Sequence, residues 1–265
     1  MAWSASQIVF PKLSWTTKKE ENKVYKFGTS GYRAFEDEFK VAMPKIVDSI
    51  TDYLVTQFNK TKKTLPLLVG GDTRGISGDS LYPIISKLTT KNIDAYFCQY
   101  AVPTPALAYA AKFFNQLGEK HKDVAGAILL TASHNPWEYG GYNFLTPNGA
   151  VVPSAISKQF EQLQEAPRQL TLDRVRLGLS ETASVYPFDA FTVYQRHLKE
   201  TLGIDFPKIR DSGLRIFYDP LYATGRNYFP RLLQEEGVDV AVLHGESDRP
   251  AGYTGMPEPN ASNLG

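Results

Sequence analysis

The chain has one cysteine, no long hydrophobic run and almost no net charge. Cys98 cannot form an internal disulfide, which is typical of a protein from a reducing compartment. No apolar run approaches the ~20 residues that a membrane-spanning helix needs, and residues 1–10 lack the pattern of a signal peptide. A net charge of +1 gives no bulk electrostatic attraction to nucleic acid or to an anionic membrane. We therefore expect a soluble, cytoplasmic protein that binds neither nucleic acid nor membranes.

The composition is sufficient for a buried core. Of the 265 residues, 42% are hydrophobic and 22% are charged, which indicates a globular protein of one or two domains. Apolar residues recur at three- and four-residue steps over 43–58 and predict an amphipathic helix with Pro44 in its first turn. Beyond this helix, predicted strands and helices alternate. The strands are 65–70, 93–99, 124–130, 214–218 and 238–243, and the helices are 79–91, 105–117, 153–165, 188–202 and 225–236.

This alternation predicts the fold class. We expect a three-layer α/β/α domain with a mostly parallel mixed sheet, followed by a truncated second α/β domain of similar type. The first domain is placed at 1–166 and includes a short hairpin near 142–149. The polar stretch 167–187 has no clean periodicity and is predicted to be a connection, which leaves 188–265 as an incomplete second domain. Cys98 lies in a predicted strand and is expected to be buried.

A hexapeptide at the end of one predicted strand carries most of the chemical information. Residues 131–136 read Thr-Ala-Ser-His-Asn-Pro and follow the apolar run 124–130. The carboxyl ends of strands in open α/β sheets are where ligands bind, so this position presents a hydroxyl and an imidazole to a ligand. Neighbouring side chains on an extended backbone point to opposite sides, so we do not expect Ser133 and His134 to form a hydrolase dyad. The chain also lacks a G-x-S-x-G elbow.

The hexapeptide resembles the phosphoserine loop of the α-D-phosphohexomutases, the phosphoglucomutase and phosphomannomutase family. Three other segments resemble family motifs in the same order: 27–34 (FGTSGYRA), 70–74 (GGDTR) and 257–264 (PEPNASNL). The second of these is not a nucleotide-binding P-loop, because Ile76 stands where that motif requires lysine. The resemblance covers 25–264 of this chain and about the first half of the family's four domains.

The resemblance implies roles for individual residues. It implies that Ser133 carries a phosphoryl group, that His134 contacts it or assists proton transfer, and that Arg33 faces the phosphoserine. The planar, permanently charged guanidinium of arginine suits phosphate. Binding of phosphate or substrate is implied for Thr29, Ser30, Arg74, Asn135 and Asn143. The alternatives are a capping serine at 133, a packed imidazole at 134, a surface salt bridge at Arg33 and a structural ion pair of Asp72 with Arg74.

Two positions depart from the family pattern. The family usually has lysine a few residues after the serine loop, in N-G-x-K, as a proposed proton-transfer group, and Asn143 stands there. An amide cannot act as an acid or base near neutral pH, so this role is in doubt. In 219–225, Ala223 stands where the family often has glycine.

Three family features have no counterpart in the chain. They are the D-G-D-x-D-R loop that binds Mg²⁺ together with the serine phosphate, the G-E-x-S-G sugar loop and the phosphate-binding loop of the fourth domain. Ser133, through its phosphate, is therefore the only metal contact that the resemblance implies here. The remaining acidic residues do not form a substitute loop: Asp211, Asp219, Asp239 and Asp248 are scattered, and 246–249 is expected to be a solvated surface loop.

We expect the parent protein to be a phosphohexomutase that interconverts a hexose 1-phosphate and a hexose 6-phosphate, with glucose phosphates as the first choice. The resemblance implies phosphoryl transfer through Ser133, with Mg²⁺ and a hexose 1,6-bisphosphate intermediate. Mannose and glucosamine phosphates are alternatives, and this piece alone is expected to be inactive. A different hypothesis is a non-catalytic module that binds phosphosugars or a partner. A truncated second domain is also expected to expose apolar surface and to self-associate.

Overall fold

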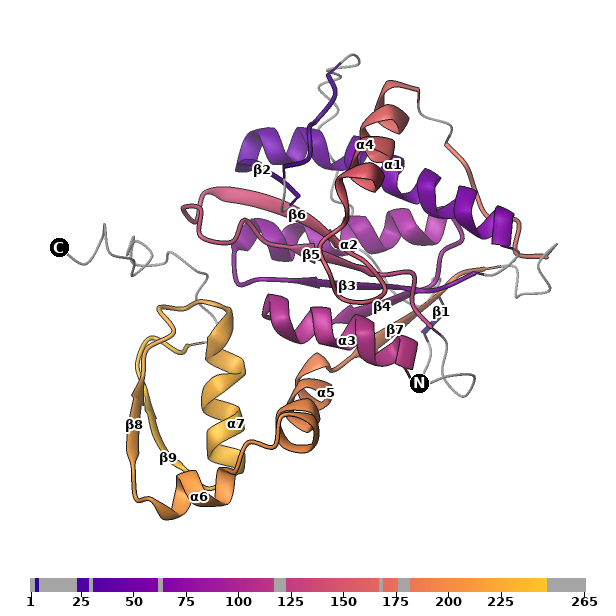
Figure 1. Cartoon of the computed structure of the whole chain (residues 1–265). Coiled ribbons are helices and arrows are strands. Elements are labelled where there is room, and N and C mark those ends of the chain that lie inside the picture. Colours follow the sequence, from indigo (N-terminus) through magenta and orange to yellow (C-terminus); the bar gives the residue numbers. More distant parts are fainter. Residues whose placement is uncertain are drawn as a thin grey trace.

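A single mixed sheet forms the centre of the larger unit. The structure, a computed structural model, describes residues 3–4, 23–28, 31–61, 64–116, 123–166, 169–175 and 182–246. The strands of this sheet are β1 (Trp3–Ser4), β2 (Tyr32–Phe35), β3 (Leu67–Gly71), β4 (Ala95–Cys98), β5 (Ala127–Leu130), β6 (Tyr139–Leu145) and β7 (Ser184–Phe188). Their order is β1-β7-β4-β3-β5-β6-β2 (Figure 1). The four central strands, β7, β4, β3 and β5, are parallel, and the outer strands pair antiparallel.

Helices cover both faces of this sheet. They are α1 (Glu36–Thr61), α2 (Gly75–Thr90), α3 (Thr104–Gln116), α4 (Ser154–Glu165) and α5 (Ala190–Arg196). Helices α1, α2 and α4 pack on one face, and α3 and α5 pack on the other (Figure 1). Successive strand residues point to opposite faces, so Leu67 and Val69 join the core under α1, whereas Leu68 joins the core under α3. The predicted three-layer α/β/α fold with a mixed sheet is confirmed.

Helix α1 is longer than predicted. It begins at Glu36, so Pro44 lies inside the helix and the expectation that this proline opens the helix is wrong. The first turn carries Glu36, Asp37 and Glu38, whose negative charges are favourable at a helix amino end. Phe39 in the following turn is 1% exposed. These charges and this burial explain why the helix extends before the proline.

The predicted connection contains a strand. Residues Ser184–Phe188 form β7, which pairs parallel with β4, so this part of 167–187 belongs to the first sheet. Pro187 argues against a strand at the level of the sequence, because proline lacks the backbone N–H that a residue in a central strand donates. One edge of β7 pairs with β4, and on the other edge β1 pairs only with Ser184 and Val185. Pro187 therefore has no described strand beside it on that second edge. Strand β7 therefore belongs to the first unit.

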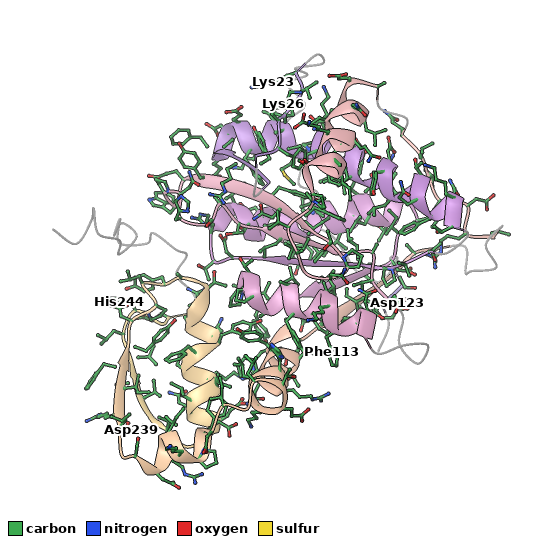
Figure 2. The ribbon with its side chains drawn as sticks, viewed as in Figure 1. Lys23, Lys26, Phe113, Asp123, Asp239 and His244 are labelled. Carbon is green, nitrogen blue, oxygen red and sulfur yellow. The ribbon has the colours of Figure 1, made fainter. Side chains whose placement is uncertain are left out.

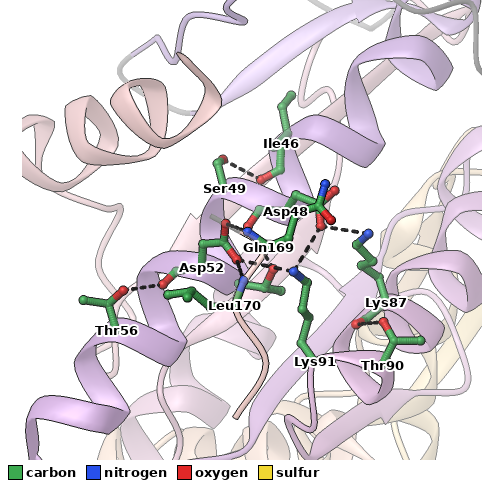
Figure 3. Close-up of polar contacts among 11 residues, drawn as sticks. Ile46, Asp48, Ser49, Asp52, Thr56, Lys87, Thr90, Lys91, Gln169 and Leu170 are labelled. Carbon is green, nitrogen blue, oxygen red and sulfur yellow. Dashed lines mark hydrogen bonds and ion pairs between the residues drawn. The ribbon is translucent and has the colours of Figure 1, made fainter. Parts of the chain in front are cut away.

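Two buried carboxylates bind parts of this stretch that the structure describes. Asp52 of α1 is fully buried and accepts hydrogen bonds from the backbone N–H groups of Gln169 at 2.8 Å and Leu170 at 2.7 Å (Figure 3). Lys91, at the end of α2, lies 3.3 Å from the same carboxylate. Asp94 accepts from Arg174 at 3.0 Å and from the Ser184 N–H at 2.7 Å. These described residues are held by polar contacts with distant carboxylates. Such contacts require no periodic pattern of apolar residues, so the sequence did not indicate them.

A smaller unit follows α5. It contains α6 (Phe206–Asp211), β8 (Arg215–Tyr218), α7 (Phe229–Glu235) and β9 (Asp239–Val242), together with a π-helical turn (His197–Thr201) and a 3-10 turn (Thr224–Asn227). Strands β8 and β9 pair parallel, and Phe191, Phe206 and Leu233 lie in the small core beside them. Figure 2 shows Asp239 and His244 at opposite ends of this unit. The side chain of Phe217 on β8 is 68% exposed, so the two-stranded sheet is covered on one face only.

The structure bears on the single cysteine and on the question of membrane-spanning helices. Cys98 is buried on β4, as predicted, and burial raises the pKa of its thiol to about 12. A thiol that stays protonated at neutral pH is a poor nucleophile, which fits a structural role. In the part of the chain that the structure describes, no helix is both long and apolar enough to cross a membrane.

Tyr142 gives a stability prediction. Its side chain is fully buried in the core under α1, and its hydroxyl has no hydrogen-bond partner among the described residues. Burial also raises the pKa of this phenol well above its usual value. Removing an unpaired buried hydroxyl removes a desolvation cost, so Tyr142→Phe is expected to leave the free energy of unfolding unchanged or to raise it by about 1 kcal/mol. Urea unfolding measures this change.

A matched control is Tyr32→Phe. The Tyr32 hydroxyl donates to Glu38 Oε1 at 3.3 Å, so this substitution is expected to lower the free energy of unfolding by about 0.5–1 kcal/mol. A loss of more than about 1 kcal/mol for Tyr142→Phe would mean that the buried hydroxyl is satisfied.

Candidate active site

The site lies at the carboxyl end of β5, where residues 131–136 lead into the antiparallel strand β6 (Figure 1). The Thr131 N–H donates to the Gly141 carbonyl oxygen at 3.0 Å, so the loop starts tight against β6. A Cβ atom on Gly141 would lie 2.0 Å from the Thr131 carbonyl oxygen, so this close approach requires glycine. Strands β3, β4 and β7 run parallel to β5 and end at the same edge of the sheet. This is the edge at which open α/β sheets bind ligands.

Ser133 is exposed and has an unusual backbone conformation. Its φ angle is 55°, in the left-handed region that side chains other than glycine rarely adopt. The Ser133 N–H donates to Thr131 Oγ1 at 3.0 Å. The Ser133 Oγ lies 3.4 Å from His134 Nδ1, so the expectation that these two side chains diverge is wrong. That expectation assumed an extended backbone, which the left-handed conformation replaces.

Arg33 approaches the loop from β2. Strand β2 pairs with β6, which places Arg33 opposite Gly141. The Arg33 guanidinium donates from NH1 to Asn135 Oδ1 at 3.0 Å. Burial lowers the pKa of Arg33, and the positive charge of Arg74 lowers it further. Two guanidinium groups therefore lie close together beside the serine loop, which is an arrangement that favours a bound anion.

Arg74 is directed into the protein. Its guanidinium donates to the carbonyl oxygens of Ser133 at 3.0 Å and Asn135 at 2.6 Å, and it forms an ion pair with the Asp72 carboxylate. Asp72 Oδ1 also accepts from the Arg74 N–H at 3.0 Å and from Ser77 Oγ at 2.7 Å. The structure thus contains the Asp72–Arg74 ion pair that was the alternative to substrate contact, and it extends this pair to the serine loop.

Asn143 lies under the turn that precedes β2. Its side chain is 7% exposed, and its Oδ1 has no hydrogen-bond partner among the described residues. A Cβ atom on Gly31 would lie 2.2 Å from this oxygen, and Gly31 has a φ angle of 98°. The amide therefore stands beside Gly31. Thr29 and Ser30, the other two residues predicted to bind phosphate, lie outside the described residues, as does the motif 257–264.

The described residues do not fit a magnesium site. No group of three or more His, Cys, Asp or Glu side chains among them is arranged to hold a metal ion. Three of the scattered aspartates are instead paired with cations: Asp211 with Arg210, Asp219 with His244 and Asp239 with Arg215. Asp248 lies outside the described residues. Mg²⁺ stays a prediction from the resemblance.

A cleft of about 830 Å³ lies between the two units. Tyr100, which follows β4, and Asp189, which follows β7, line it from the first unit. Arg226, Arg231 and His244 are among the residues that line it from the second unit. Neither Ser133 nor His134 lines this cleft. The candidate nucleophile is thus exposed on the sheet edge rather than enclosed in that cleft.

Three residues contribute in ways that the motifs alone did not indicate. Thr131 Oγ1 accepts the Ser133 N–H, and Asp72 and Ser77 orient Arg74. The only local signal was the spacing of Asp72 and Arg74, since an aspartate often accepts from the N–H two residues later. The contact of Arg74 with the serine loop joins residues far apart in the sequence and has no local signal.

The chain is similar to known proteins over most of its length. The sequence pattern of phosphoglucomutase/phosphomannomutase, alpha/beta/alpha domain I, matches residues 24–170, which is more than half of the chain. A phosphoglucomutase from Komagataeibacter xylinus is 26% identical over 228 residues, covering 84% of this chain and 40% of that protein. A phosphoglucosamine mutase from Ruminiclostridium cellulolyticum is 28% identical over 229 residues, covering 84% of this chain and 46% of that protein. The chain thus spans less than half the length of these two relatives.

A solved structure shows the same fold. Parafusin, a phosphoglucomutase from Paramecium, superimposes in its open form with a TM-score of 0.74 at 22% sequence identity. The match covers 91% of this chain and 46% of parafusin. The matched pattern spans strands β2 to β6, the serine loop and both arginines of the candidate site. The chain therefore belongs to the phosphoglucomutase/phosphomannomutase family, the α-D-phosphohexomutases.

Proposed function

We propose that Ser133 carries a phosphoryl group in the interconversion of a hexose 1-phosphate and a hexose 6-phosphate by the full-length protein. The observation that carries the proposal is the convergence of two guanidinium groups on one loop. Arg33 and Arg74 both donate to Asn135, one to its side chain and one to its carbonyl oxygen, while Ser133 stays exposed two residues away. This neighbourhood stabilises the dianion that a phosphoserine adds.

His134 is positioned to move the serine proton. In the loading step, Ser133 Oγ attacks a phosphorus atom of a hexose 1,6-bisphosphate, so that an Oγ–P bond forms and the bond from phosphorus to the sugar oxygen breaks. The Oγ proton passes to His134 Nδ1, 3.4 Å away, and the sugar oxygen leaves and takes up a proton. The reverse transfer returns the phosphoryl group to a hexose monophosphate. Asn143 takes no part in this proton transfer, because its amide does not titrate near neutral pH.

Glucose phosphates are the first substrates to test, and mannose and glucosamine phosphates are the alternatives. The names of the two relatives point to both glucose and glucosamine phosphates. Bisphosphates of both sugars therefore belong in the same experiment.

Intact mass spectrometry tests the proposal on the full-length protein of which this chain is expected to be a part. After incubation with glucose 1,6-bisphosphate and Mg²⁺, the protein is expected to gain ~80 Da that phosphatase removes and that maps to Ser133. Ser133→Ala is expected to abolish the gain completely. The matched control is Ser154→Ala, at an exposed serine on α4, which is expected to leave the gain unchanged. A gain that persists in Ser133→Ala, or no gain with either bisphosphate, contradicts the proposal.

A second candidate function is a non-catalytic phosphosugar-binding or interaction module. Asn143 in the place of a titratable lysine supports it, as does the lack of a metal-binding group among the described residues. Exposed apolar side chains on the second unit, including Phe217 and Leu243, support self-association of such a module. The absence of phosphoryl uptake combined with saturable binding of a hexose phosphate would favour this second function.

A further inference from the structure

The left-handed conformation of Ser133 needs a physical cause. A side chain at a φ angle of 55° crowds its own backbone, so this conformation persists only where the surrounding structure enforces it. Local hydrogen bonds contribute: the Ser133 N–H donates to Thr131 Oγ1 at 3.0 Å, and the Asn135 N–H donates to the Ala132 carbonyl oxygen at 3.1 Å. The second bond closes a turn across Ser133 and His134, and neither bond contacts the Ser133 carbonyl oxygen itself.

Arg74 fixes the orientation of that carbonyl. One nitrogen of its guanidinium, NH2, donates to the carbonyl oxygens of both Ser133 and Asn135, at 3.0 and 2.6 Å. These two carbonyl groups lie on either side of His134 in the sequence. The planar guanidinium of Arg74 therefore sets the orientation of both peptide planes. The side chain of Arg74 is 8% exposed, which shields both hydrogen bonds from water.

Arg74 is itself held rigidly. The Asp72 carboxylate, also 8% exposed, pairs with the other terminal nitrogen, NH1, and accepts from the Arg74 N–H at 3.0 Å. Ser77 Oγ in the first turns of α2 donates to the same carboxylate at 2.7 Å. The chain of contacts therefore runs from α2 through Asp72 and Arg74 to the loop. Both terminal nitrogens of Arg74 already bind protein groups, which leaves no free pair for bidentate contact with a substrate phosphate.

We infer that Arg74 is a positioning residue, which holds Ser133 in the left-handed conformation so that its Oγ faces His134 Nδ1. The Ser133–Asn135 carbonyl pair is the point of contact, and Asp72 is the support that keeps the guanidinium in place. The kinetic part of this inference rests on the proposed function, and the conformational part does not. The experiment has one arm for each part.

The conformational arm compares S133G with S133A in two backgrounds. Neither variant has the hydroxyl, so their difference reports the cost of a Cβ atom at this φ angle together with the larger entropy of glycine in the unfolded chain, and only the first of these terms depends on Arg74. With Arg74 present, S133G is expected to have an unfolding equilibrium constant about fivefold smaller than that of S133A in urea unfolding. In an R74M background the loop is free to relax, so the ratio of the unfolding equilibrium constant of S133A to that of S133G is expected to fall to about 1 or below. The same ratio of the two unfolding equilibrium constants with and without Arg74 would overturn the inference.

R74M leaves the buried Asp72 carboxylate without its partner and can prevent folding. The double variant D72N/R74M removes both charges and serves as the second background. If R74M does not fold, the comparison of S133G with S133A in D72N/R74M decides the conformational arm by the same criterion.

The kinetic arm separates positioning from substrate contact. R74K keeps the charge of the side chain but loses the planar contact with two carbonyls. Phosphoryl uptake from glucose 1,6-bisphosphate is expected to lose about tenfold or more in its maximal rate, while the half-saturating concentration changes by less than about twofold. A raised half-saturating concentration with an unchanged maximal rate would instead place Arg74 on the donor phosphate and overturn the inference. If the parent chain takes up no phosphoryl group, the proposed function fails and the conformational arm still decides the role of Arg74.

Discussion

Replacing Asp52 by alanine is expected to cost about 3–5 kcal/mol of the free energy of unfolding, which is much of the stability of a typical domain. The substitution removes the acceptor of two backbone N–H groups, those of Gln169 and Leu170, and the counter-charge of Lys91 (Figure 3). The Lys91 side chain is 7% exposed, so its ammonium group would remain buried without its closest carboxylate. Urea unfolding followed by circular dichroism measures the change.

Asp211→Ala is the matched control for this prediction. Asp211 is 67% exposed and pairs only with the adjacent Arg210 among the salt bridges of the described residues. Its replacement is expected to change the free energy of unfolding by at most about 0.5 kcal/mol. A cost below about 1 kcal/mol for Asp52→Ala would show that this carboxylate does not anchor the 169–170 segment.

Replacing Gly141 by alanine is expected to lower the free energy of unfolding by about 3 kcal/mol and to abolish phosphoryl uptake by Ser133. The added Cβ atom would lie 2.0 Å from the Thr131 carbonyl oxygen and 2.7 Å from the Ala132 Cα. Both neighbours are backbone atoms, so the start of the serine loop must move away from β6. Urea unfolding and intact mass after incubation with the bisphosphate measure the two effects.

Gly78→Ala is the control for Gly141. Gly78 lies in α2, and a Cβ atom there would meet no atom within 4 Å. Alanine is favoured over glycine in a helix, so this variant is expected to gain about 0.5–1 kcal/mol and to keep phosphoryl uptake. Equal stability of the Gly141→Ala and Gly78→Ala variants would mean that the contact between β6 and the loop is not tight.

The fold was largely predictable because its main elements are local patterns. The predicted helices and the strands at 65–70, 93–99 and 124–130 match α1 to α4 and β3 to β5, with boundary shifts. The strands that were missed are β1, β2 and β7, which have two to five residues each. Their pairing joins distant parts of the chain, such as Val185 with Ala95, and no local periodicity encodes such a contact.

The sequence predicted which residues make up the candidate site, and it did not predict how their side chains are oriented. The motifs indicated that Ser133, His134 and Arg33 matter, because their order resembles that of a known family. The left-handed backbone of Ser133 depends on a glycine at 141, a threonine at 131 and an arginine at 74, which three different elements bring together. The direction of a side chain in a loop is set by such tertiary contacts, so a prediction that assumes an extended chain fails there.

The late position of β7 in the sequence has a consequence for synthesis on the ribosome. The nascent chain makes β3, β4 and β5 early, but the partner on the outer side of β4 is Ser184–Phe188, which follows all of α4 and the segment anchored by Asp52. Until those residues leave the ribosomal tunnel, β4 has an unpaired edge that can pair with another nascent chain. Folding of the first unit during translation therefore cannot finish before the start of the second unit is being made.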